Sequence, residues 1–314
     1  MTKGLDIKRI VVYLAFAFGI AWATALVIYR TGGLQNSPLL APNITLALVL
    51  LAAVYMSAPT MAHILTRLIT REGWQNVYLR PKLRRGWKYW LICWLAPGIL
   101  TIIGLMVFFA LFPQYYDPSL SSLRQMLEQA GKSLPPINPW TIIMLQLLQA
   151  MLIAPFINGI FTFGEEFGWR AYLQPKLIPL GGRKAMILMG IIWGVWHWPV
   201  IAMGHNYGLD YPGFPWLGLL AMVWFTFLIG TLIGWATLRG GSVWPAVIGH
   251  AAINGIAGIG VLMAKGNPNP ILGPMPVGII GSIGFAIVVL WIFLHPDALE
   301  MPKAELPQVQ EDAC

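Results

Sequence analysis

Long apolar blocks alternate with short polar connections along most of this chain of 314 residues. A transmembrane helix needs about 20 mostly apolar residues. Eight blocks approach or reach that length: residues 10–29, 43–66, 88–112, 140–164, 184–203, 215–238, 243–264 and 275–295. The pattern therefore predicts an all-α fold, a polytopic membrane helical bundle of about eight transmembrane helices.

The composition strengthens this prediction. Hydrophobic residues make up 57% of the chain and charged residues only 10%, with a mean hydropathy of +0.68. A soluble domain carries about 25% charged residues. The two cysteines, Cys93 and Cys314, are too few for a disulfide framework.

The basic residues predict the orientation. With the N-terminus inside, 16 of the 20 Lys and Arg residues fall in inside segments, and the outside loops hold Arg30, Arg124, Lys132 and Lys265. Basic residues are enriched in cytoplasmic loops, so we expect both termini to be cytoplasmic in a protein of the plasma membrane. The net charge of +8 is then a topology signal. Membrane lipid is the expected partner, and nucleic acid is not.

The spans divide the chain into three parts. Residues 1–139 hold three spans and a basic cytoplasmic loop, residues 140–264 form the core with the polar residues described next, and residues 265–314 hold the last span and a polar tail. The segment Ser119–Ala130 is predicted to form a short amphipathic helix in the longest outside loop. The tail from Pro296 is predicted to be disordered.

Ionisable and amide residues recur inside three spans of the core. The fourth span ends in Glu165 and Glu166, the fifth contains His197, and the seventh contains His250 and Asn254. Ionisable residues at membrane depth are rare, and function is their default explanation.

Helical spacing groups these residues. Glu166 and Arg170 are four apart and can pair on one helix face, whereas Glu165 is rotated by about 100° and faces another neighbour. His250 and Asn254 have the same spacing and share a face.

The fifth span has a similar arrangement. Trp193 lies four residues before His197 and is expected to pack under its imidazole. Pro199 has no N–H to donate to the carbonyl of Val195. The helix is therefore predicted to loosen beside His197 and to free a backbone acceptor near the site.

Two kinds of chemistry fit this set. A carboxylate and a histidine can activate a water molecule, while a second histidine and an asparagine can stabilise an oxyanion. Glu165, His197 and His250 with an open position are also suitable ligands for a divalent metal such as zinc. The sequence leaves open whether the cofactor is a metal or none.

Purely structural explanations exist for the single residues. Glu166 and Arg170 alone can form an ion pair at the headgroup boundary, and His197 or His250 alone can bond between helices. The recurrence of polar groups on three spans favours function for the whole set. His63 in the second span is predicted to be an interfacial packing residue, and His205 and His295 are predicted to be solvated at span ends.

Other protease signatures are missing from the sequence. It contains no HExxH zinc motif, no GxSxG serine motif and no aspartate inside a predicted span. These absences argue against the helix-borne zinc, serine-elbow and intramembrane aspartyl classes.

The three motifs together resemble one family. The segment EEFGWR at Glu165–Arg170 resembles the EExxxR motif of the CPBP family (CAAX protease and bacteriocin-processing, also called Abi). Trp193 to His197 resembles its FxxxH motif, and His250 to Asn254 resembles its HxxxN motif. The resemblance covers about residues 140–264. Trp193 stands where the family often has phenylalanine, and we expect this to change the shape of the pocket without loss of chemistry.

The resemblance implies an eight-helix intramembrane endopeptidase of the CAAX prenyl protease type 2 kind, a group often classed as metalloendopeptidases. Carried over, Glu165 and His197 activate water. His250 and Asn254 stabilise the tetrahedral intermediate, while Glu166 and Arg170 orient the site.

The expected function is therefore hydrolysis of a peptide bond near the cytoplasmic face. The substrate is a peptide or a prenylated protein whose C-terminus is held at the membrane. One alternative is a non-catalytic immunity or scaffold protein. Another is a transporter or proton relay that uses the same buried acids, although paired broken helices in two repeated halves, its usual sign, are not visible.

Overall fold

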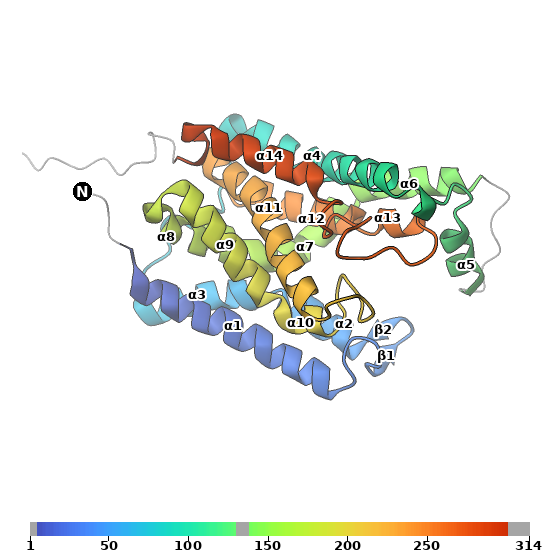
Figure 1. The fold of residues 1–314 in the computed structure, drawn as a ribbon. Coiled ribbons are helices and arrows are strands. Elements are labelled where there is room, and N and C mark those ends of the chain that lie inside the picture. The colour runs from blue at the N-terminus through green and yellow to red at the C-terminus, as the bar shows by residue number, and fades with distance from the viewer. Residues whose placement is uncertain (1–4, 130–137, 301–314) are drawn as a thin grey trace, which may run out of the picture.

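The computed structural model of the chain describes residues 5–129 and 138–300. Helices dominate these residues (Figure 1). The α-helices are α1 (Ile7–Arg30), α2 (Leu46–Leu50), α3 (Ala58–Thr70), α4 (Leu83–Leu111), α5 (Ser121–Gln129), α6 (Pro139–Leu152), α7 (Ala154–Gly168), α8 (Gln174–Leu177), α9 (Gly182–Trp196), α10 (Trp198–Ala202), α11 (Trp216–Gly240), α12 (Trp244–Ile256), α13 (Ile259–Leu262) and α14 (Ile283–Leu294).

The other elements are short. Two π-helices, η1 (Leu51–Tyr55) and η3 (Trp169–Leu173), continue α2 and α7, and the 3₁₀ turns are η2 (Pro113–Tyr115), η4 (Ile178–Leu180) and η5 (Pro296–Leu299). Within the described residues, strands occur only as the antiparallel hairpin of β1 (Leu39–Ala41) and β2 (Ile44–Thr45). The all-α prediction is confirmed.

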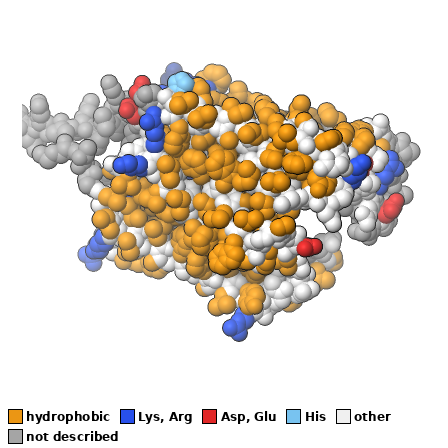
Figure 2. Space-filling view, in the orientation of Figure 1, with side chains coloured by type: hydrophobic (Ala, Val, Ile, Leu, Met, Phe, Trp, Pro, Cys, Tyr) orange, Lys and Arg blue, Asp and Glu red, His pale blue; other side chains and the backbone are white. Residues whose placement is uncertain are grey.

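Five helical segments are long and apolar enough to cross a membrane: Ile7–Arg30, Leu46–Thr70, Leu83–Leu111, Trp216–Gly240 and Trp244–Leu262. A sixth candidate is the pair Pro139–Leu152 and Ala154–Leu180, which is bent by 48°. Hydrophobic side chains cover most of the face in Figure 2, with Lys and Arg around its edges. The chain is therefore a polytopic membrane protein.

Two of the eight predicted spans are shorter than a full crossing. The fifth is interrupted after α9, a helix of 15 residues, because the chain turns at His197 before Pro199. The eighth is reduced to α14, a helix of 12 residues, because turns rich in Gly and Pro precede Ile283. The count of eight and the side of the membrane on which the termini lie remain predictions.

The bundle is arranged around α11. This helix is buried over most of its length and packs against α4, α9, α12 and α14. Helix α7 lies between α3 and α12, so that the polar residues of α7 and α12 face one another inside the bundle. In Figure 1, α1 begins and α14 ends at the same end of the bundle.

The predicted amphipathic segment forms α5, which begins later than expected, at Ser121. The Asp117 carboxylate accepts hydrogen bonds from the backbone and hydroxyl groups of Ser119 and Ser121. Leu120 and Leu123 are buried beneath the segment. Residue 130, the adjoining loop and the tail from residue 301 lie outside the described residues.

Candidate active site

The two acids lie side by side near the end of α7. The side chains of Glu165 and Glu166 are buried, with 3% and 0% of their surface exposed. The π-helix η3 follows directly and carries Arg170, which is also buried. Charged groups buried this completely are stable only when they are paired.

Glu166 has two partners on one oxygen. Arg170 donates from Nη1 to Glu166 Oε1 over 3.0 Å, which confirms the predicted pair. The Nδ1 atom of His250 lies 2.8 Å from the same oxygen. Because a carboxylate accepts, His250 carries a proton on Nδ1 and turns its Nε2 atom elsewhere.

Glu165 is held by a different group. The indole Nε1 of Trp193 on α9 donates to Glu165 Oε2 over 2.9 Å. The prediction that Glu165 faces a neighbour other than Arg170 is therefore confirmed. The sequence pattern did not indicate this partner, because nothing in the spacing predicts which way an indole N–H points.

Trp193 also brings the other site residues together. Its ring lies 4.1 Å from the guanidinium carbon of Arg170, a cation–π contact. Its ring centroid is 5.2 Å from that of His250 and 5.7 Å from that of His197. Residues from α7, η3, α9 and α12 thus meet around one indole. The predicted packing of Trp193 against His197 is present, with the rings tilted by 57°.

His197 follows the end of α9 and is half-buried. Its Nδ1 atom lies 2.8 Å from the carbonyl oxygen of Trp193. Since a carbonyl only accepts, the proton of the neutral ring is on Nδ1, and Nε2 retains its lone pair. This tautomer is the one a general base needs.

The predicted break beside His197 exists, but the acceptor that side chains use there is the carbonyl of Trp196 and not the predicted carbonyl of Val195. The hydroxyl of Tyr55 donates to the carbonyl of Trp196 over 2.5 Å, and the indole of Trp22 donates to the same oxygen over 3.2 Å. Tyr55 is buried, and its ring packs 4.4 Å from that of Trp196. These two residues support the backbone next to His197, and no motif in the sequence pointed to them.

Asn254 lies one turn beyond His250 on α12, as the spacing predicted. It is exposed, and among the described residues no hydrogen bond joins its side chain to the rest of the site. The structure therefore brings together five of the six predicted residues, Glu165 and His197 through their contacts with Trp193, and leaves Asn254 at their edge.

The proposed metal ligands do not form a metal centre as arranged. Among residues 5–129 and 138–300, no group of three or more His, Cys, Asp and Glu side chains is placed to hold an ion. The Nδ1 atoms of both histidines are engaged by Trp193 and Glu166.

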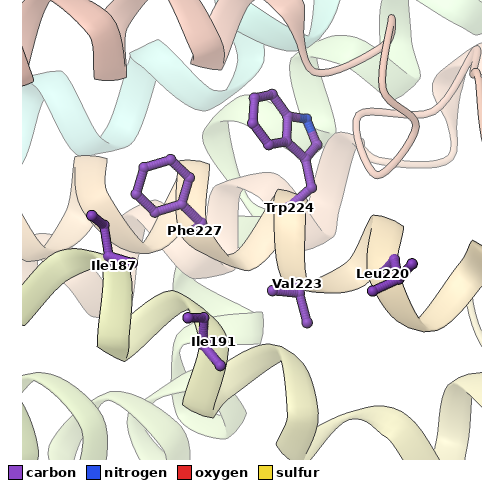
Figure 3. A pocket seen from close by; sticks show the side chains of 6 residues that line it. All are labelled: Ile187, Ile191, Leu220, Val223, Trp224 and Phe227. Carbon is purple, nitrogen blue, oxygen red and sulfur yellow. The ribbon is translucent and has the colours of Figure 1, made fainter.

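A groove on the outside of the bundle is separate from this site. It has a volume of about 430 Å³ and lies between α9 and α11. Its lining side chains are all apolar (Figure 3): Ile187, Ile191, Leu220, Val223, Trp224 and Phe227. This groove offers no group for acid–base chemistry.

Comparison with known proteins agrees with the position of the site. Residues 139–256 match the profile of a family described as Rce1-like, type II CAAX prenyl endopeptidase Rce1-like. A curated relative from Methanococcus maripaludis, named CAAX prenyl protease 2, is 35% identical over 93 residues. This alignment covers 29% of the present chain and only about a third (34%) of the relative.

The family match contains all six predicted site residues, from Glu165 to Asn254. It therefore agrees with the resemblance carried by the three motifs. Residues 139–256 of this chain are therefore similar to the Rce1-like family, and the chain spans about a third of the length of the curated relative.

Proposed function

We propose that the chain is an intramembrane endopeptidase that hydrolyses a peptide bond with water activated by Glu165 and His197. The observation that carries this proposal is the convergence of Glu165, Arg170, His197 and His250 around Trp193 inside an apolar bundle. A polar set of this kind is costly at membrane depth and is typical of a functional site.

The hydrogen bonds indicate a division of roles. Trp193 occupies Glu165 Oε2, which leaves Oε1 to accept a proton from water, and the lone pair on His197 Nε2 is a second acceptor. Either group within hydrogen-bond reach of the water would raise its nucleophilicity towards a carbonyl carbon.

His250 fits the role of a donor to the developing oxyanion. Its Nδ1–H is held by Glu166, so Nε2 is the ring nitrogen left to face the substrate, and it would donate to the oxyanion in the imidazolium form. Asn254, on the same face of α12, supplies a neutral amide donor. Arg170 fixes Glu166 and balances its charge, so that it orients His250.

The proposed substrate is a peptide or protein with a membrane-held C-terminus. A prenylated C-terminus is the first one to test, because the curated relative is named CAAX prenyl protease 2. A lipid anchor would hold such an end close to a site that lies inside an apolar helical bundle. We place the reaction at the cytoplasmic side of the plasma membrane, following the distribution of basic residues.

Peptide cleavage by the purified protein in lipid tests the proposal. Wild-type protein should cut a farnesylated peptide ending in a C-a-a-X sequence, and Glu165→Ala and His250→Ala should not. Mass spectrometry of the fragments identifies the bond that is cut. Wild-type-like cleavage by either variant would overturn the mechanism.

The same variants separate the alternatives. Cellular function that survives alanine at Glu165, His197, His250 and Asn254 would indicate a non-catalytic membrane factor. Solute or proton flux in proteoliposomes without any cleavage would indicate a transporter.

A further inference from the structure

Helix α3 touches the acid-bearing helix α7 on both sides of the acid pair. A Cβ atom on Gly164 would lie 2.9 Å from the carbonyl oxygen of Met56, and one on Gly168 would overlap the backbone of Pro59. Only glycine permits this close approach. The backbone of Met56–Pro59, where α3 begins, therefore packs directly against the part of α7 that carries Glu165 and Glu166.

Two side chains of α3 also bond to backbone carbonyls of α7. Thr60 donates its hydroxyl to the carbonyl of Phe163 over 3.3 Å. The Nδ1 atom of His63 lies 2.8 Å from the carbonyl oxygen of Phe167, and the two rings pack 4.4 Å apart. Phe167 follows Glu166 directly in the chain.

Arg67 determines which ring nitrogen of His63 carries the proton. Its Nε atom donates to His63 Nε2 over 2.6 Å. An arginine nitrogen only donates, so His63 Nε2 accepts, and Nδ1 carries the proton that goes to the Phe167 carbonyl. His63 is completely buried and Arg67 nearly so.

Arg67 is itself held in place. Its Nη1 atom donates to the carbonyl of Gly73 over 2.5 Å. Its guanidinium lies over the rings of Trp74 and Tyr172, 5.8 Å and 5.4 Å from their centroids. Tyr172 belongs to η3, so Arg67 contacts the π-helix that carries Arg170.

The bonded carbonyl lies where the helix changes its pattern. The α-helix ends at Gly168, and the π-helix η3 begins at Trp169. A π-turn interrupts the regular ladder of backbone bonds and is frequent at functional sites. A donor from outside the helix stabilises a carbonyl at such a junction, and the junction sets how Arg170 faces Glu166.

We propose that His63 and Arg67 form a positioning pair for the active site. Arg67 orients His63, and His63 holds the junction between α7 and η3 so that Glu165, Glu166 and Arg170 keep their relative positions. The pair lies on α3, outside the segment matched by the family, and its catalytic consequence rests on the proposed function.

The test compares His63→Ala with His63→Asn in the cleavage assay. The asparagine amide can still donate to the Phe167 carbonyl, whereas alanine leaves that carbonyl without its partner. We expect His63→Ala to lower kcat about tenfold, the effect of a lost buried hydrogen bond, with KM unchanged. His63→Asn should recover most of the rate. His295→Ala, which removes an exposed histidine at the end of α14, is the control and should match wild type.

Amide hydrogen exchange over residues 168–175 provides a readout independent of cleavage. His63→Ala should speed exchange in this segment, and His63→Asn should restore it. Wild-type kcat and exchange in His63→Ala would overturn the proposal, as would equal loss of kcat in both variants. If wild-type protein cleaves no peptide, the proposed function fails, while the exchange result still decides whether His63 holds the junction.

Discussion

Trp193 contacts more of the candidate site than any other residue of the three motifs. It donates to Glu165, stacks on Arg170 and touches both histidines. The sequence showed only that an aromatic residue lies one turn before His197. Its hydrogen bond to Glu165 depends on the rotamer and on the packing of α9 against α7, which no local pattern encodes.

Replacing Trp193 with phenylalanine separates the ring from its N–H group. Trp193→Phe keeps an aromatic surface between Arg170 and the histidines but removes the donor to Glu165. A hydrogen bond to a charged group contributes about 1.5–3 kcal/mol, so we expect kcat to fall about tenfold or more with KM unchanged. Steady-state cleavage kinetics measure this.

The matched control is Trp198→Phe, which removes the indole bond to the carbonyl of Leu219 on α11. It should leave kcat near that of wild type. A Trp193→Phe variant with wild-type kcat would show that the indole N–H has no role in positioning Glu165.

Asn254 and Arg170 should differ in what their loss affects. Asn254 is exposed and has no bond within the described part of the site, so Asn254→Ala should leave the melting temperature unchanged. Loss of one oxyanion donor lowers kcat by about 100-fold or more. Full activity in Asn254→Ala would remove this residue from the mechanism.

Arg170→Ala removes one side of a buried pair and should destabilise the protein by about 3–5 kcal/mol.

Residue spacing within one helix predicted a side-chain pair of the site correctly. Contacts between helices cannot be predicted from such spacing. The Glu166–Arg170 pair follows from an interval of four residues on a single helix. The contacts of His250 with Glu166 and of His63 with Phe167 join residues 84 and 104 positions apart. The sequence predicts only a packing role for His63, because its own span gives no indication of its partner on α7.

At the scale of elements, the close contact of α3 and α7 depends on Gly168. Gly168→Ala places a methyl group against the backbone of Pro59, and neither helix can relax without moving the acid pair. Overpacking of this kind costs about 1–3 kcal/mol. We expect a lower melting temperature together with reduced cleavage.

Gly159→Ala is the control on the same helix. Its Cβ would lie 3.7 Å from a methyl group of Val247, an ordinary contact. This variant should be as stable as wild type or slightly more so, because alanine favours a helix over glycine. Equal stability of Gly168→Ala and Gly159→Ala would contradict the close packing described for α3.

The start of α5 should respond to acid. Burial raises the pKa of Asp117, but the hydrogen bonds from Ser119 and Ser121 outweigh it and lower this pKa to about 2. An unfolded aspartate has a pKa of about 3.9. The stabilisation is therefore complete above that value and is lost as the pH falls towards 2.

Cleavage by pepsin, which works in this range, measures the change. Cuts in residues 119–129 should increase between pH 4 and pH 2, relative to an unstructured peptide of the same sequence. Asp117→Asn should be cut readily at both values. Cleavage of wild type that does not change with pH would show that the Asp117 carboxylate does not hold this helix.

Elements were predictable where the apolar pattern was continuous. The spans that became α1, α4 and α11 have nearly the predicted bounds. Deviations occur at His197, two residues before Pro199, and before Ile283, where Gly and Pro recur, whereas Pro97 inside α4 does not end that helix. At those places tertiary contacts decide where a helix ends, and a count of apolar residues overestimates its length.

A second polar cluster, centred on Glu72, connects the N-terminal helices to the segment that follows α7. Glu72 accepts from Tyr172 of η3 over 2.8 Å and from Lys176 of α8 over 2.5 Å, and it lies 3.5 Å from Arg9 of α1. Burial raises the pKa of Glu72, but these bonds outweigh it and hold the pKa below its ordinary value. The cluster ties the N-terminal helices to the segment that carries Arg170. These bonds cross the boundary at residue 139, and the division predicted from the spans stays a prediction.

One substitution tests the central claim, that Glu165 is the base of a hydrolytic site. Glu165→Gln keeps a carbonyl oxygen that can accept from Trp193 and removes only the basic group. General base catalysis contributes about 100-fold or more, so single-turnover cleavage by this variant in lipid should be slower by at least that factor, with an unchanged melting temperature. A wild-type single-turnover rate in Glu165→Gln would contradict the account.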